Sequence, residues 1–147
     1  MSRTVLGIVK LSGSPEQPCA FKRACDKARV RFKCESVPSL EQGIAYLRGV
    51  GEYADRRRHP VPALVVLDGN LDEDGGLQAL LWIRSQPAFR YLPVVVVSES
   101  KSQLEMKRAY DRGASSYLLK PRSFAGLVEL IKVIDRYWLT LNQTPAP

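Results

Sequence analysis

The chain has 147 residues, of which 45% are hydrophobic and 25% are charged, and 22 Lys and Arg against 15 Asp and Glu give a formal charge of +7. This composition argues against intrinsic disorder, and the length suits one domain with a sizeable core. No apolar stretch is long enough for a membrane span or a signal peptide. Three cysteines without a CxxC spacing argue against a disulfide framework or a zinc site. We therefore expect a single cytoplasmic domain.

Five short apolar runs alternate with helical patterns along the chain. The third and fourth runs lack alternating polar residues and are rich in valine, which is typical of strands buried on both faces of a parallel sheet. The runs are Val5–Val9, Arg31–Val37, Ala63–Leu67, Pro93–Val97 and Ala114–Leu119.

A helix is predicted after each run. Ser39, with Gln42 three residues on, can cap the second helix, and Gly113 can end the fourth. The predicted helices cover residues 16–29, a segment that begins after Ser39, and residues 75–86, 101–112 and 123–141.

Apolar side chains recur at helical spacing in the third and last helices. We expect the last helix to carry a second apolar face as well, which we interpret as an interface with a partner. The third helix should bury Leu77, Leu80, Leu81 and Trp82; the last should bury Leu127, Leu130, Ile131, Ile134, Trp138 and Leu141 and expose Phe124, Val128, Val133 and Tyr137.

The fivefold alternation of strand and helix predicts a single α/β domain, a doubly wound, five-stranded parallel sheet with five helices. The domain should span residues 1–141, and the polar, proline-containing tail 142–147 is expected to be disordered.

Polar residues stand where the last three predicted strands end. Asp68 follows the third run, Ser98 the fourth and Lys120 the fifth. Working groups gather at the carboxyl ends of strands in such a sheet, so we expect a carboxylate, a hydroxyl and an ammonium group to share one pocket. A carboxylate can attack phosphorus, and Lys120, Ser98 and backbone N–H groups near Asn70 could stabilise the transferred group.

These segments resemble response-regulator receiver domains. The resemblance rests on Ala63-Leu-Val-Val-Leu-Asp68-Gly-Asn, on Val94-Val-Val-Val-Ser98 and on Tyr117-Leu-Leu-Lys120-Pro121, with Ser98, Tyr117 and Lys120 lying 30, 49 and 52 residues after Asp68. It extends from Val5 to about Leu141 and implies a flavodoxin-like fold.

The resemblance also implies a role for each matching residue. Asp68 would accept a phosphoryl group from a histidine kinase or a phosphotransfer protein, and Lys120 would pair with a phosphate oxygen. Ser98 and Tyr117 would move together as the switch, and the carbonyl of Asn70 would help to hold Mg²⁺. Such a chain would be a phosphoacceptor with slow autodephosphorylation at most, not a conventional enzyme, and the Lys120–Pro121 bond would be cis as is usual in the family.

The insert Gly49–Pro62 and the ending Asp135–Leu139 are most similar to receivers that partner bacterial phytochromes. The resemblance implies a stand-alone protein that signals by association. The homodimer would form through the fourth helix, the fifth strand and the last helix.

The sequence departs from the family after the first run. The family has two adjacent acidic residues there for Mg²⁺, whereas this chain has Lys10-Leu-Ser-Gly-Ser14. Mg²⁺ requires oxygen ligands, usually with one or two carboxylates, so Mg²⁺ binding is doubtful. An acidic run, Asp72 to Asp74, follows Asp68 and is interpreted as a loop cap. Two functions remain open: a phosphorylated single-domain response regulator, and a pseudo-receiver that acts as a phosphorylation-independent interaction module.

Two weaker signals are given structural interpretations. Ser12-Gly13-Ser14 would suit a cofactor phosphate, as in a flavodoxin-like cofactor binder, but we interpret it as a loop with a helix cap. Residues 1–60 hold 12 Lys and Arg against 6 Asp and Glu. Without interleaved aromatic residues this excess, including Arg56-Arg57-Arg58, is interpreted as solvated charge and not as a nucleic-acid site, and His59 as loop surface.

Overall fold

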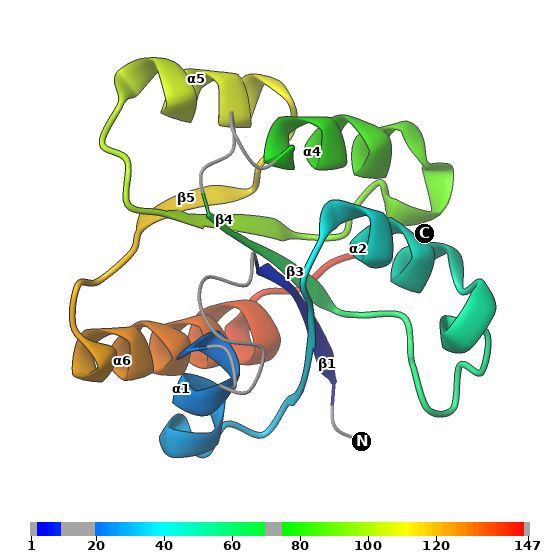
Figure 1. The fold of residues 1–147 in the computed structure, drawn as a ribbon, viewed down its shortest axis with the longest axis horizontal. Coiled ribbons are helices and arrows are strands. Elements are labelled where there is room, and N and C mark those ends of the chain that lie inside the picture. Colours follow the sequence, from blue (N-terminus) through cyan, green and yellow to red (C-terminus); the bar gives the residue numbers. More distant parts are fainter. Residues whose placement is uncertain (1–2, 10–19, 70–74, 146–147) are drawn as a thin grey trace.

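Five parallel strands form one sheet in the order β2-β1-β3-β4-β5 (Figure 1). The computed structural model describes residues 3–9, 20–69 and 75–145. The strands are β1 (Thr4–Val9), β2 (Lys33–Val37), β3 (Leu64–Asp68), β4 (Val94–Ser98) and β5 (Ser116–Leu119). The order reverses at β1, as the doubly wound interpretation requires, and the fold prediction is confirmed.

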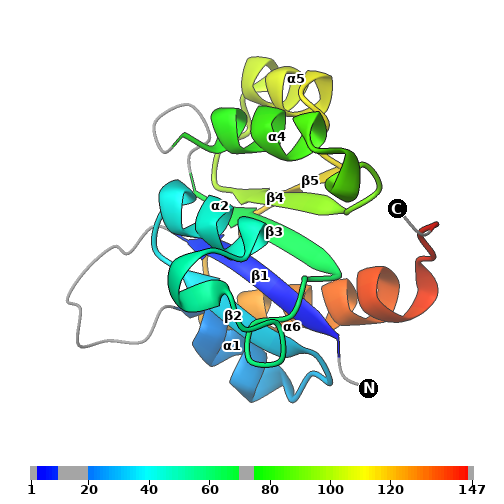
Figure 2. The ribbon, with the colours of Figure 1, turned by 90° about the vertical axis from the view of Figure 1, so that its right-hand side faces the viewer.

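Helices cover both faces of the sheet (Figures 1 and 2). On one face lie α2 (Leu40–Arg48), α4 (Gly76–Ser85) and α5 (Gln103–Asp111), and on the other α1 (Ala20–Ala28) and α6 (Phe124–Ile134). Short helical turns η1 (Gly51–Tyr53) and η2 (Pro87–Phe89) follow α2 and α4, and the π-helix η3 (Asp135–Leu141) extends α6. No helix among the described residues is long and apolar enough to cross a membrane.

The central strands divide the core into two layers. Val94 and Val96 of β4 pack with the α2, α4 and α5 side, whereas Val95 and Val97 pack with α1 and α6. All four are at most 2% exposed. Alternate side chains of a strand point to opposite faces, so an unbroken valine run is what a strand covered on both sides requires.

The predicted helix ends are present. The Ser39 hydroxyl accepts the N–H of Gln42 (3.2 Å) at the start of α2, and Gly113 has a left-handed φ of 104° after α5. Both devices satisfy backbone groups that a helix end leaves unpaired. Gly113 also lies against Arg84, whose Cγ would be 2.6 Å from an added Cβ. The Lys120–Pro121 peptide is trans, which is the intrinsically favoured form, so the expectation of a cis bond was wrong.

The prediction for α4 was wrong for Leu81 only, since Leu80 is buried and Leu77 and Trp82 pack against the same core layer. Ala79, Leu80 and Ile83 are buried, whereas Leu81 is 51% exposed. Residues 76, 79, 80 and 83 form one helical stripe, and the small side chain of Ala79 fits within it. Trp82 is partly buried against this core layer and also packs beside Phe89 of η2, with ring centroids 6.2 Å apart.

The last helix changes its winding at Asp135. A π-helix has more residues per turn, so Leu139 (8% exposed) joins the core beside the partly buried Trp138, whereas Leu141 is 59% exposed and was wrongly expected to be buried. Val128 is buried as well, and Phe124 and Val133 lie nine positions, or half a rotation, apart. The predicted second apolar face of α6 is therefore not one continuous face.

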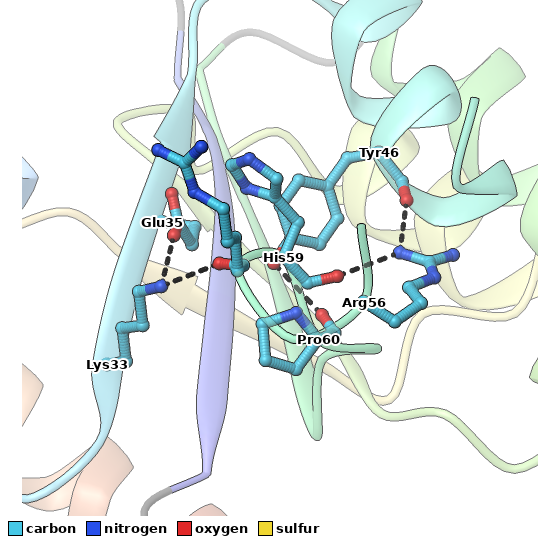
Figure 3. A network of polar contacts seen from close by, with 7 residues as sticks. Lys33, Glu35, Tyr46, Arg56, His59 and Pro60 are labelled. Carbon is cyan, nitrogen blue, oxygen red and sulfur yellow. Dashed lines mark hydrogen bonds and ion pairs between the residues drawn. The ribbon is translucent and has the colours of Figure 1, made fainter. Parts of the chain in front are cut away.

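The insert between α2 and β3 folds over the end of α2 (Figure 3). The guanidinium of Arg56 donates to the carbonyls of Tyr46 (2.8 Å), Leu47 (2.7 Å) and His59 (3.1 Å), and the Tyr46 hydroxyl donates to the carbonyl of Pro60 (2.9 Å). Burial raises the pKa of Tyr46 to about 12. We call Tyr46, Arg56, His59 and Pro60 the insert network.

Two interpretations of the insert were wrong. Arg56 is not a solvated charge, because its guanidinium donates to carbonyls in the last turn of α2, where helical partners run out; the carbonyl of Tyr46 also accepts the N–H of Gly49. His59 is half-buried, with its ring edge-on to the rings of Tyr46 (5.7 Å) and Tyr53 (5.2 Å). An imidazole is flat and largely apolar, so it packs between aromatic rings as readily as it lies in solvent.

Candidate functional site

The carboxyl ends of β3, β4 and β5 lie side by side. In the sheet Asp68 is opposite Val97 and Ser98 is opposite Leu119, and the N–H of Lys120 donates to the carbonyl of Ser98 (2.8 Å). The ladder therefore places Asp68, Ser98 and Lys120 on one sheet edge, as expected from parallel strands that end at equivalent positions.

Asp68 and Lys120 form a partly buried ion pair. The Nζ atom of Lys120 is 3.0 Å from Oδ2 of Asp68, whose side chain is 3% exposed against 27% for Lys120. The other oxygen, Oδ1, is buried and has no hydrogen-bond partner among the described residues. Buried carboxylate oxygens are normally bonded, so Asp68 has one oxygen held by a cation and one left unused.

The pKa of Asp68 is raised from its ordinary value. Burial of the carboxyl group is the main cause, the negative charge of Glu99 adds to it, and the ion pair with Lys120 opposes both. Removal from water therefore costs this carboxylate more than Lys120 returns. Asp68 ends β3, whose other four residues are apolar and buried. The fold therefore holds a carboxylate where it is poorly solvated.

The Ser98 side chain bonds to α5 and to the loop that precedes it. Its hydroxyl donates to Oε2 of Glu105 (3.3 Å) and accepts the N–H of Ser100 (3.1 Å). The hydroxyl of Tyr117 contacts the same Oε2 atom and the carbonyl of Ser100 (2.9 Å). We call Ser98, Ser100, Glu105 and Tyr117 the switch cluster.

The sequence interpretation missed Glu105 and Glu99. Glu105 is 3% exposed although it is charged. Ser102-Gln-Leu-Glu105 reads as a capping box, which predicts that the carboxylate bonds the Ser102 N–H. That N–H donates instead to the hydroxyl of Ser100 (3.1 Å), and the Glu105 carboxylate turns inward. The capping-box pattern marked the residue but not the direction of its side chain.

The described residues fit a divalent cation poorly. Oδ1 of Asp68 is free to be one ligand, but no group of three His, Cys, Asp or Glu side chains that could hold a metal occurs in the described ranges. Mg²⁺ usually needs more oxygen ligands than one carboxylate provides. Asn70, the acidic run 72–74 and the segment 10–19, with Ser12-Gly13-Ser14, lie outside the described residues.

Two curated proteins are similar to this chain in sequence. FilR2 of Methanothrix harundinacea, a probable methanogenesis regulatory protein, is 38% identical over 128 residues, which cover 87% of this chain and 77% of FilR2. The response regulator Rcp1 of Synechocystis is 31% identical over 103 residues, covering 70% of this chain and 68% of Rcp1.

Solved structures of response regulators have the same fold as this chain. The response regulator RPA3017 in red light signalling of R. palustris superposes with a TM-score of 0.85 at 28% identity, covering 99% of both chains. The phosphorylated cyanobacterial phytochrome response regulator RcpA superposes with a TM-score of 0.82 at 27% identity, covering 99% of this chain and all of RcpA. Residues 21–132 match the family described as the response regulator receiver domain. This chain therefore belongs to the receiver domains of response regulators, with the phytochrome-associated, stand-alone regulators among its relatives.

Proposed function

We propose that this protein is a single-domain response regulator that accepts a phosphoryl group on Asp68 and signals through association with other proteins. The observation that carries the proposal is that the two oxygens of the Asp68 carboxylate have different surroundings. Oδ2 is paired with Lys120, and Oδ1 is buried with no partner in the part of the chain that the structure describes. A nucleophile needs a free lone pair, and a developing phosphoryl charge needs a fixed cation nearby.

In the transfer step, Oδ1 of Asp68 attacks the phosphorus of a phosphohistidine. The new O–P bond forms as the P–N bond breaks, and the imidazole leaves with the electron pair of that bond. Lys120 balances charge on the transferred oxygens, and the Ser98 hydroxyl donates to one of them after it leaves Glu105. The donor would be a histidine kinase or a phosphotransfer protein; since RPA3017 and RcpA serve light signalling, we favour a phytochrome-linked kinase. The setting would be the cytoplasm.

Intact-mass measurement with acetyl phosphate and Mg²⁺ tests this proposal. We expect a phosphoryl adduct on the wild-type protein, none on Asp68→Asn, and an unchanged adduct on the control Asp111→Asn, which alters an exposed aspartate of α5. A cognate kinase, or beryllofluoride binding with the same loss in Asp68→Asn, gives an independent measurement. An adduct that survives in Asp68→Asn would contradict the assignment of the phosphoacceptor.

The alternative function is a phosphorylation-independent interaction module. The missing acidic pair after β1, where the sequence has Lys10-Leu-Ser-Gly-Ser14, favours it, although the structure of Rcp1 contains Mn²⁺. A module would show neither an adduct nor a change on addition of Mg²⁺ and beryllofluoride, in the wild-type protein as in Asp68→Asn.

Association would occur through a homodimer that uses α5, β5 and α6. All three elements expose large apolar side chains: Leu104 and Tyr110 on α5, Leu119 on β5, and Val133, Tyr137 and Leu141 on α6 and η3, whereas Phe124, half a rotation from Val133, does not share its face. Sedimentation of Val133→Glu and Leu104→Glu tests the two helices separately, and Val61→Glu, in the insert, is a matched control because Val61 is 55% exposed. A dimer that withstands both helix variants would exclude this interface.

A further inference from the structure

One buried carboxylate contacts both residues of the expected switch. Oε2 of Glu105 accepts the hydroxyl of Ser98 (3.3 Å) and lies within hydrogen-bonding distance of the hydroxyl of Tyr117. Glu105 is 3% exposed and Ser98 is 1% exposed. A buried carboxylate is costly unless donors surround it, so these two hydroxyls are part of what keeps Glu105 inside the protein.

The hydroxyl of Ser98 has only one hydrogen to donate. While it donates to Glu105, it cannot donate to a phosphoryl group on Asp68. Turning toward Asp68 breaks the contact with Glu105, and the carboxylate must then rely on Tyr117. The orientation of the Ser98 hydroxyl and the hydrogen bond of Tyr117 are therefore linked through Oε2 of Glu105.

A chain of hydrogen bonds joins the same hydroxyl to the start of α5. The Ser98 oxygen accepts the N–H of Ser100, the Ser100 hydroxyl accepts the N–H of Ser102 (3.1 Å), and the Ser102 hydroxyl accepts the N–H of Glu105 (3.2 Å). Rotation of Ser98 removes the first acceptor of this chain. The loop after β4 and the first turn of α5 must then rearrange their bonds.

We propose that Glu105 is a positioning residue that holds Ser98 away from Asp68 in this state. When Ser98 leaves Glu105, the lost hydrogen bond changes the contact of Glu105 with Tyr117 and the bonds at the start of α5. This inference rests on the proposed function, because it assigns a regulator to the same phosphoacceptor. Glu105 does not touch the reacting atoms. It acts by competing with the phosphoryl group for the Ser98 hydroxyl, so it opposes activation until the phosphoryl group is present.

Beryllofluoride titration by calorimetry, with Mg²⁺ present, measures the competition. Glu105→Gln keeps the shape of the side chain but removes its charge, and we expect the affinity to rise about tenfold, since a hydrogen bond to a charged group is worth that much or more. Glu105→Met should act in the same direction. Glu129→Gln is the matched control, because Glu129 is an exposed glutamate on α6 that pairs with Lys132; it should leave the affinity unchanged.

A double variant separates positioning from a general structural effect. In a Ser98→Ala background, Glu105→Gln has no hydroxyl to release, so the tenfold gain should vanish. An equal gain in that background, or no gain in the wild-type background, would overturn the proposal while leaving Asp68 as the phosphoacceptor. If the wild-type protein binds no beryllofluoride, the proposed function fails, and the competition with it.

The contact with Tyr117 can be measured without phosphoryl chemistry. Burial and the bond to Glu105 raise the pKa of the Tyr117 phenol. In protein labelled with ¹³Cζ-tyrosine, Glu105→Gln should lower that pKa, whereas Glu129→Gln should not; Tyr117→Phe assigns the resonance. An unchanged Tyr117 titration would show that Glu105 does not hold Tyr117 and would overturn the proposed link.

Discussion

The site at Asp68 and the insert network both contain charged and hydroxyl groups that are buried or partly buried. They differ in how many hydrogen bonds those groups make. In the insert network, Arg56 reaches three carbonyls and Tyr46 reaches a fourth. At the sheet edge, Asp68 has an unused buried oxygen, and Ser98 makes a long bond to Glu105. The bonds of Arg56 and Tyr46 fix the loop, whereas the incomplete contacts of Asp68 and Ser98 leave these groups able to exchange partners.

An unpaired atom alone does not identify a functional site. Nδ1 of His59 is also buried without a partner among the described residues, yet it lies between two tyrosine rings. Asp68 differs because its unpaired atom belongs to a carboxylate that a fixed cation already contacts. Asp68 has both an unpaired carboxylate oxygen and a lysine in contact with the other oxygen. His59 has no such cation, so we interpret Asp68 as a reactive group and His59 as a packing residue.

The largest expected effect concerns the cation of the site. Lys120→Ala should lower the rate of phosphorylation by acetyl phosphate about 100-fold, as loss of a preorganised charge-stabilising donor does elsewhere. Quantitative intact-mass time courses measure it. Lys107→Ala, which removes an exposed lysine that pairs with Asp111, is the control and should not change the rate. Equal rates for wild type and Lys120→Ala would mean that the ion pair is structural only.

The second effect concerns the insert network and should appear in stability instead of phosphorylation. Arg56→Ala removes the guanidinium bonds to three carbonyls, of which that of Tyr46 keeps the N–H of Gly49, and should lower the free energy of unfolding by about 2 kcal/mol. Urea unfolding measures the change. Arg57→Ala is the matched control, since Arg57 is exposed and its backbone N–H, which the substitution keeps, donates to Asp55. An Arg56 variant as stable as Arg57→Ala would show that the insert folds without this clamp.

These two regions differ in how well the sequence predicted them. Asp68, Ser98 and Lys120 were predicted to share an edge because strand ends in a parallel sheet are set by the apolar runs, and the ladder places them so. The direction of a side chain depends on its neighbours in space. That is why the bond of Ser98 to Glu105, the clamp by Arg56 and the π-helix that exposes Leu141 could not be predicted from spacing.

The third prediction uses the raised pKa of Asp68 and has the opposite sign to the Arg56 effect. Because burial disfavours the charged form, the folded protein holds the Asp68 proton more tightly than the unfolded chain does. This contribution to stability is present below the unfolded pKa, near 3.9, and is lost as pH rises through the raised folded pKa.

Asp68→Asn removes the buried charge, and Lys120, being partly exposed, can turn to water. The variant should therefore melt at a higher temperature than the wild type at pH 7, by less than Arg56→Ala lowers it, and the difference should shrink toward pH 4. Thermal unfolding followed by circular dichroism across this range measures it. A variant less stable than wild type at neutral pH would show that the ion pair outweighs the cost of burial.

The smallest effect tests whether the unpaired nitrogen of His59 matters. His59→Phe keeps a flat ring between Tyr46 and Tyr53 and leaves the His59 carbonyl available to Arg56. We expect a change within about 0.5 kcal/mol in the free energy of unfolding and none in the rate of phosphorylation, because no bond is lost and an unsatisfied buried nitrogen is removed. His59→Ala should be less stable, since it leaves a space between the rings. A slower phosphorylation of His59→Phe would connect the insert to the phosphoacceptor and remove the distinction between the two regions.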